Sequence, residues 1–134
     1  MSLLKKVKEL NNFSDKNKFV NLICNGDCVG LVHKKIANFI IESKLAYFFK
    51  NDSLILKERN KNKLNSILAN TTDLLVKKKI IKVITGEMFP CTLNIMGKVY
   101  FELDRALVEY LGIRGYGVHL VAYVKENKKI KIWT

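Results

Sequence analysis

The chain has 134 residues, of which 49% are hydrophobic and 27% are charged, enough for one domain or for one domain plus the edge of another. Apolar residues recur throughout, which excludes disorder over most of the chain and is typical of a soluble globular protein. The longest apolar runs, such as residues 45–49, are far too short to span a membrane, whereas the net charge of +12 could attract phosphates or nucleic acid.

The positive charge is carried by 21 Lys and only 3 Arg residues. Lys lacks the planar guanidinium fork with which Arg recognises phosphates and bases in a bidentate manner. The densest cluster, Lys77–Lys79 with Lys82, follows an apolar helical pattern and fits the solvated end of a helix. We therefore interpret the charge as a basic surface and do not expect nucleic acid as the main partner.

The three cysteines predict free thiols in a reducing, cytoplasmic environment, because their number is odd and no secretory signal is expected at the Lys-rich start. Cys24 and Cys28 could face each other across a hairpin, and with Cys91 and either His33 or His119 they would form a nominal zinc set. Paired Cys-x2-Cys knuckles are missing, so we interpret the cysteines as small buried hydrophobes. We expect no metal and no cofactor in this chain.

Hydrophobic periodicity and turn residues predict five elements in the first 80 residues. In chain order these are a helix over 2–10, a hairpin of 18–24 and 28–32 around Asn25-Gly26, a helix over 33–44, a hairpin of 45–49 and 53–57, and a helical pattern over 60–80. Thr71 and Thr72 leave open whether this last pattern is one helix or two.

The remaining residues predict further hairpins and one short helix. We expect a hairpin over 94–101 turning near Met96-Gly97, a helix over 103–111 capped by a left-handed Gly112, a strand over 116–124, a polar turn over 125–129 and a strand over 130–133. The predicted fold class is α+β, with short antiparallel hairpins alternating with helices.

Motifs for catalysis are missing from the sequence. There is no glycine-rich phosphate loop, no Gly-x-Ser-x-Gly elbow and no His-Glu-x-x-His, so no catalytic residue is expected. His33 would open a helix, and His119, in an apolar strand, favours a hydrogen-bonded core position over a catalytic one. Glu102 and Asp104 could share a cation, but Asp104 more readily caps the following helix, beside Arg105.

Four short segments in a fixed order carry a family resemblance. They are Glu87-Met88-Phe89-Pro90, residues 101–106 (Phe-Glu-Leu-Asp-Arg-Ala), Leu111-Gly112-Ile113 and Tyr116-Gly117-Val118-His119. Together they resemble the N-terminal region of Nudix hydrolases called thiamine-pyrophosphokinase-related proteins. The resemblance covers the chain from about residue 18 to its end, and its order and spacing are more specific than any single motif.

The resemblance implies two parts of unequal size. Residues 1–113 would form an N-terminal accessory α+β domain, and residues 114–134 would form the opening hairpin of an incomplete Nudix-like domain, resembling the first strands of its sheet. A Nudix box holds Mg²⁺ with Arg-Glu and Glu-Glu pairs, and the 134 residues contain no Glu-Glu pair. We therefore expect the chain to be inactive by itself, with Mg²⁺ bound by the missing domain.

The accessory domain would help to form the pocket for a small-molecule diphosphate, either a thiamine diphosphate-like or a nucleoside diphosphate compound. On the matched motifs, the candidate substrate-binding residues are Glu87, Arg105 and His119, with Arg105 suited to a phosphate and Glu87 to a cationic or amine-bearing ring. The chain departs from the family at Thr85-Gly86, where a Trp-Arg pair is usual.

Two other functions are consistent with the sequence. The charge and five tyrosines could serve a small basic module that binds nucleic acid or an acidic partner, although the aromatic residues recur at spacings typical of a core. A scaffold that forms a homodimer through an exposed strand edge at residues 130–133 is the third possibility.

Overall fold

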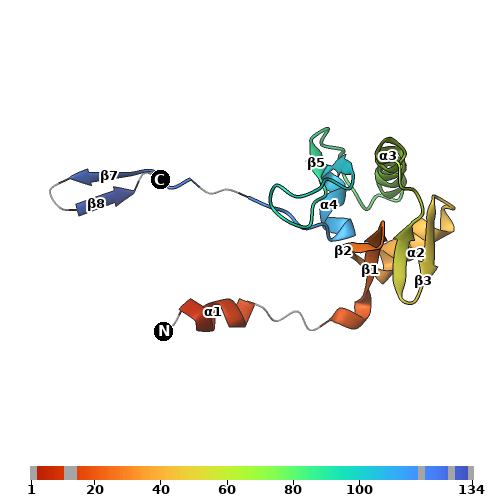
Figure 1. Ribbon diagram of the computed structural model, residues 1–134, viewed down its shortest axis with the longest axis horizontal. Coiled ribbons are helices and arrows are strands. Elements are labelled where there is room, and N and C mark those ends of the chain that lie inside the picture. The colour runs from red at the N-terminus through yellow and green to blue at the C-terminus, as the bar shows by residue number, and fades with distance from the viewer. Residues whose placement is uncertain (1–2, 11–14, 118–119, 127–128, 133–134) are drawn as a thin grey trace.

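The computed structural model describes residues 3–10, 15–117, 120–126 and 129–132. It has the α+β class that the sequence predicts (Figure 1). No helix in these ranges is long and apolar enough to cross a membrane. The elements in chain order are α1 (Leu3–Leu10), the 3-10 turn η1 (Lys16–Lys18), β1 (Phe19–Cys24), β2 (Asp27–His33), α2 (Lys34–Glu42), β3 (Tyr47–Lys50), β4 (Ser53–Leu56), α3 (Lys61–Lys77), β5 (Met88–Pro90), β6 (Glu102–Asp104), α4 (Arg105–Leu111), β7 (Tyr123–Glu126) and β8 (Lys129–Ile132).

The largest sheet has four strands in the order β2-β1-β4-β3. It consists of two antiparallel hairpins, joined side by side through the parallel pair β1–β4. Both hairpins turn through two residues with positive φ, Asn25 (53°) with Gly26 (90°) and Asn51 (49°) with Asp52 (53°). Such turns match the right-handed twist of the strands they join. Both predicted hairpins are confirmed.

The helices begin where polar side chains cap them. His33 Nδ1 accepts a hydrogen bond from the Lys35 amide (3.2 Å), so His33 opens α2 as the sequence predicts. Asn60 Oδ1 accepts from the amides of Asn62 and Lys63 and opens α3. One continuous helix, α3, covers most of residues 60–80, and the hydroxyls of Thr71 and Thr72 donate to carbonyls four residues earlier within it.

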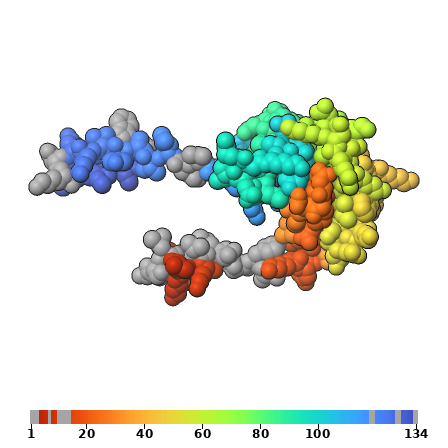
Figure 2. Space-filling model, in the orientation of Figure 1, coloured from red at the N-terminus to blue at the C-terminus, as the bar shows by residue number. Residues whose placement is uncertain are grey.

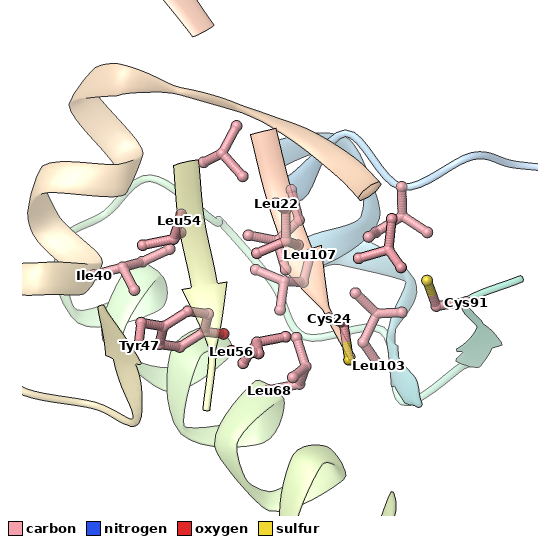
Figure 3. Close-up of a cluster of buried hydrophobic side chains, with 14 of the residues drawn as sticks. Leu22, Cys24, Ile40, Tyr47, Leu54, Leu56, Leu68, Cys91, Leu103 and Leu107 are labelled. Atoms are coloured by element: carbon pink, nitrogen blue, oxygen red, sulfur yellow. The ribbon is translucent and has the colours of Figure 1, made fainter. Parts of the chain in front are cut away.

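The core lies where one face of the sheet meets the helices (Figure 3). Leu22 of β1, Leu54 of β4, Ile40 of α2, Leu68 of α3 and Leu107 of α4 are all fully buried in a single cluster. Alternate residues of β1 and β4 are buried, the pattern of a sheet with one covered face.

Within the core, the Tyr47 hydroxyl lies 2.9 Å from Thr71 Oγ1, which itself donates to the Ile67 carbonyl. The Tyr47 hydroxyl is therefore the donor to Thr71. Burial raises the pKa of Tyr47 well above its ordinary value, since it disfavours the phenolate.

The predicted hairpin over 94–101 is wrong in its strand pairing. Met96-Gly97 is a turn, closed by a 2.9 Å bond from the Gly97 amide to the Asn94 carbonyl, but no strand flanks it. The chain pairs over a longer loop instead: β5 is antiparallel to β6, and Cys91 extends the pairing through backbone bonds of 2.9 Å to Tyr100 and Phe101. This register buries Cys91, Phe101 and Leu103 together, which a tight hairpin at Gly97 would not do.

The predicted strand over 116–124 is also wrong for most of its length. Only Tyr123 and Val124 belong to a strand, β7, while residues 116–117 and 120–122 are irregular and His119 lies outside the described residues. Leu120 and Val121 are exposed, because no strand of the described chain lies alongside them. β7 and β8 form an antiparallel hairpin that extends away from the rest of the fold (Figures 1 and 2).

The cysteines differ from one another in exposure. Cys24 and Cys91 are buried, as predicted, but Cys28 is exposed; the two-residue turn Asn25-Gly26 pairs Cys24 with Asp27 and Cys28 with Ile23. Cys24 and Cys28 therefore do not face each other. Burial raises the pKa of Cys24 to about 11 and that of Cys91 to about 12, so both stay protonated at neutral pH.

We expect a thiol-specific chromogenic disulfide to modify Cys28 quickly in the folded protein and the other two cysteines only after unfolding. The reason is that the reaction needs an accessible thiolate. Absorbance at neutral pH should show one fast equivalent, rising to three in guanidinium. A Cys28→Ser variant should lose the fast phase. Rapid modification of all three thiols without denaturant would contradict the burial of Cys24 and Cys91.

Candidate functional site

The candidate site is built around the junction of β6 and α4. Asp104 ends β6 and caps α4, accepting a 2.8 Å hydrogen bond from the Ala106 amide. Its carboxylate also accepts bonds from the Thr85 amide (3.2 Å), the Thr85 hydroxyl (2.8 Å) and the Gly86 amide (2.7 Å). Asp104 is thus the helix cap that the sequence favoured, and it also fixes the segment before β5 against α4.

The hydrogen bonds of Asp104 decide its protonation. Burial pushes the pKa of the carboxyl upward, but the bonds from Ala106, Thr85 and Gly86 outweigh burial and hold the pKa below its ordinary value. The carboxylate therefore stays charged at neutral pH and acts as a hydrogen-bond acceptor.

Next to this junction, Glu87 and Arg105 are joined twice. The Arg105 amide donates to the Glu87 carbonyl (2.8 Å), and the Arg105 guanidinium donates to the Glu87 carboxylate (2.9 Å). Both side chains are largely exposed, at 63% and 59% of their surface, so the pair is accessible to a ligand. The fold brings together two of the three predicted site residues, and the third, His119, lies outside the described residues.

Glu87 and Arg105 stand at the edge of a surface cavity of about 620 Å³, the site cavity from here on. Its apolar wall comes from Phe89 of β5 and from Val108 and Ile113, in and after α4. Thr85 and Glu109 add a hydroxyl and a second carboxylate. An apolar wall with a few charged groups at one side suits the binding and orientation of a small molecule.

A second cavity of about 270 Å³, the α3 groove, lies on the other side of the same segment. Residues 84–89 alternate between the two: Thr85, Glu87 and Phe89 line the site cavity, whereas Ile84, Gly86 and Met88 line the α3 groove. Gly86, with a positive φ of 73°, lies within the segment, so the chain before β5 reaches both cavities without being a regular strand.

Other predicted groups are not brought together. Glu102 pairs with Lys61 (3.3 Å) while Asp104 bonds to the Thr85 segment, so the two carboxylates do not share a cation. Among the described residues, no three His, Cys, Asp or Glu side chains are grouped as metal ligands. Sequence reasoning missed Thr85 and Glu109 of the site cavity. The helical spacing from Arg105 could have indicated Glu109, whereas strand alternation would not have indicated Thr85, because Gly86 has a positive φ and β5 begins only at Met88.

Comparison with known proteins adds family membership to this geometry. Residues 2–115 match the family described as "Domain of unknown function (DUF4743)". The chain belongs to this family. The match includes α1, the four-stranded sheet, both cavities and the Glu87–Arg105 pair, and it stops before the β7–β8 hairpin.

Two curated proteins of Arabidopsis thaliana are similar to this DUF4743 chain. Nudix hydrolase 20, chloroplastic, is 26% identical over 140 residues, which cover 96% of the chain and 37% of the relative. Nudix hydrolase 24, chloroplastic, is 23% identical over 135 residues, which cover 97% of the chain and 37% of the relative. The chain thus spans little more than a third of each relative's length, and the similarity lies in their N-terminal part.

Proposed function

We propose that the chain is an accessory domain of a Nudix-type diphosphate hydrolase, in which residues 1–113 help to form the substrate pocket. Residues 114–134 would then be the opening hairpin of the Nudix-like domain. Support comes from the two Nudix hydrolases that align over nearly the whole chain while extending well beyond it. The observation that carries the proposal is the Glu87–Arg105 pair at the edge of the site cavity.

The site cavity supplies binding and orientation. Phe89, Val108 and Ile113 would take an apolar or aromatic ring of the substrate. Arg105 has five donors and would hold a phosphate oxygen, giving up part of its bond to Glu87. Glu87 would then face a cationic or amine-bearing ring, and His119 remains a proposed third contact. We propose thiamine diphosphate-like compounds and nucleoside diphosphates as the substrate classes to compare.

The described residues around the site cavity do not fit a catalytic magnesium ion. Mg²⁺ requires several carboxylate or water oxygens around one point. Near the site cavity, however, the Asp104 carboxylate accepts four hydrogen bonds and the Glu87 carboxylate is bonded to Arg105, and Glu109 adds only one further carboxylate. We therefore propose that Mg²⁺ is bound by the domain that would follow, and that the present chain does not carry out hydrolysis.

The β7–β8 hairpin supports the proposed division at residue 114. Tyr123, Ile130 and Ile132 lie on one face of it, together with Lys125, and these three apolar residues are 61–64% exposed. A two-stranded hairpin is marginally stable in water and needs further strands or a packing partner. Additional strands of a Nudix-like domain would cover this apolar face.

The first experiment is a diphosphate hydrolysis assay with Mg²⁺, on this chain and on the product of its gene extended beyond Thr134. Activity in the longer protein and none in the shorter one supports an accessory role. Activity in the shorter chain would overturn the proposal. Inactivity of both favours a basic binding module, since Lys77–Lys79 are exposed; its signature is oligonucleotide binding that survives about 0.2 M salt.

A Glu87→Gln substitution separates binding from stability. Because the ion pair is exposed, we expect the free energy of unfolding to change by less than about 0.5 kcal/mol. In the extended protein KM should rise by about tenfold, the effect of losing one charged contact to substrate. The matched control is Glu42→Gln, at an exposed glutamate of α2 that is distant from Glu87 in the sequence. It should leave the free energy of unfolding and KM unchanged. An unchanged KM in Glu87→Gln would exclude Glu87 from the site.

The free thiols favour a reducing compartment, which we propose to be the cytoplasm. Both relatives carry the word chloroplastic in their names, so fluorescence localisation of the tagged native gene product is the deciding measurement.

A further inference from the structure

The α3 groove is a mainly apolar cavity lined on one side by a helix. One wall is α3, which contributes Asn65, Ala69, Thr72 and Asp73; these residues span about 12 Å of helix. The opposite wall is the extended segment with Ile84 and Met88, which are 46% and 57% exposed, and the buried Leu103 forms the floor. The lining is predominantly apolar, and its apolar rim residues are uncovered.

The groove also has a charge. Of its two carboxylates, that of Asp104 is taken up by hydrogen bonds from Thr85, Gly86 and Ala106. Asp73 lies exposed on α3 and makes no ion pair with any described residue. The groove therefore presents one uncompensated negative charge, in a chain whose net charge is +12.

Helix α1 has the complementary properties. Its eight residues, Leu-Leu-Lys-Lys-Val-Lys-Glu-Leu, span about 12 Å, the same length as the groove wall on α3. At 3.6 residues per turn, the positions of residues 3, 4, 7 and 10 form one apolar stripe, Lys6 and Lys8 flank it, and Lys5 lies opposite. So short an amphipathic helix is not stable in water without a packing partner.

Figure 1 shows α1 set apart from the body of the fold, on the side away from α3. Leu4 is 67% exposed, and no ion pair joins Lys5, Lys6, Lys8 or Glu9 to another described residue. The groove on α3 and the helix that matches it are thus far apart within one molecule.

We propose that α1 of one copy docks into the α3 groove of a second copy, with its apolar stripe on Ile84, Met88 and Leu103 and the flanking Lys8 on Asp73. The exchange is reciprocal and closes a two-fold dimer, because each copy offers one helix and one groove. Recognition of this kind uses apolar anchors for affinity and charges at the rim for orientation. The proposal is independent of the proposed hydrolase role.

Sedimentation velocity over about a hundredfold range of protein concentration tests the proposal. We expect a monomer–dimer equilibrium for the full chain and a monomer after removal of residues 1–14. Asp73→Lys and Lys8→Glu should each weaken dimerisation by about tenfold, and the double variant should recover most of the loss. Lys5→Glu, on the opposite side of α1, is the matched control and should dimerise as the unaltered chain does.

Each contrary result overturns the proposal. If the full chain remains monomeric at every concentration, α1 does not dock into the α3 groove of a second copy. A dimer that survives removal of residues 1–14 is formed elsewhere, for which the β7–β8 hairpin is the alternative surface. Failure of the charge reversal to restore dimerisation would separate Lys8 from Asp73. Circular dichroism of each variant verifies that the fold is retained.

Discussion

Replacing Gly112 with alanine is expected to lower the free energy of unfolding by about 3–4 kcal/mol. Gly112 closes α4 in the left-handed region, at φ 58°, where a side chain is strained. An added Cβ would also lie 2.2 Å from the Leu31 carbonyl oxygen in β2, a backbone atom that cannot move without the strand. Urea denaturation of the variant measures the sum of these two costs.

Substitutions at two other glycines measure the cost of backbone strain and the cost of steric collision separately. Gly26 also has positive φ, but nothing lies within 4 Å of its added Cβ, so Gly26→Ala should cost about 1–2 kcal/mol from strain alone. For Gly30, a Cβ would lie 2.3 Å from the Leu111 carbonyl at ordinary φ, so Gly30→Ala should cost about 1–3 kcal/mol from collision alone. If Gly112→Ala were no worse than Gly26→Ala, the close contact between β2 and the end of α4 would be wrong.

Asp104→Ala is expected to destabilise the protein by about 3 kcal/mol, from the lost helix cap and the lost bonds to Thr85 and Gly86. The loss should also free the segment that carries Glu87, so protease cleavage near residues 84–87 should become faster. Thr85→Val, which keeps the side-chain shape but removes the hydroxyl bond to Asp104 and the exposed bond from the Glu87 amide to the hydroxyl, is the partial control and should cost about 1 kcal/mol.

The same carboxylate predicts a pH dependence. The pKa of Asp104 is lowered in the folded protein, so its contribution is fully present above the pKa of the unfolded chain, near 4, and is lost as the pH falls through the folded pKa. The difference in unfolding free energy between the native chain and Asp104→Ala should therefore be constant near neutral pH and shrink below about pH 4. A difference that grows on acidification would show that the carboxylate is not held in its charged form.

The parts of the fold that sequence predicted best are those fixed by neighbouring residues. Asn25-Gly26 dictates a two-residue hairpin, His33 and Asp104 cap the helices that follow them, and Gly112 ends α4 in the left-handed region. Each is a local interaction in which side-chain chemistry or a positive φ selects one backbone conformation.

The pairing of strands that are distant in the sequence was harder to predict from the sequence. A hairpin at Met96-Gly97 was predicted from local turn residues, but residues 88–91 pair with residues 100–104 instead. The apolar run before β7 predicted a long strand, yet a strand needs a neighbour, and the described chain supplies β8 alone. Burial of each residue depends on partners that local patterns do not contain.

For the candidate site, the family motifs selected Glu87 and Arg105, and the fold places their charged groups 2.9 Å apart. The cavity beside them was not foreseeable, because its wall combines β5 with both ends of α4, segments whose meeting depends on the Asp104 bonds. A carboxylate that caps a helix is a common local feature; that it also fixes a distant segment is visible only in three dimensions.

Residues 84–89 form a partition one chain thick, with the site cavity on one side and the α3 groove on the other. A molecule that displaces this partition toward one side necessarily enlarges one cavity at the expense of the other. A ligand that displaced the segment would link the occupancy of the two cavities, and such linkage is reciprocal: whatever factor one ligand imposed on the affinity of the second, the second would impose on the first. The hydrogen bonds from Thr85 and Gly86 to Asp104 hold this segment in place and would oppose such a displacement.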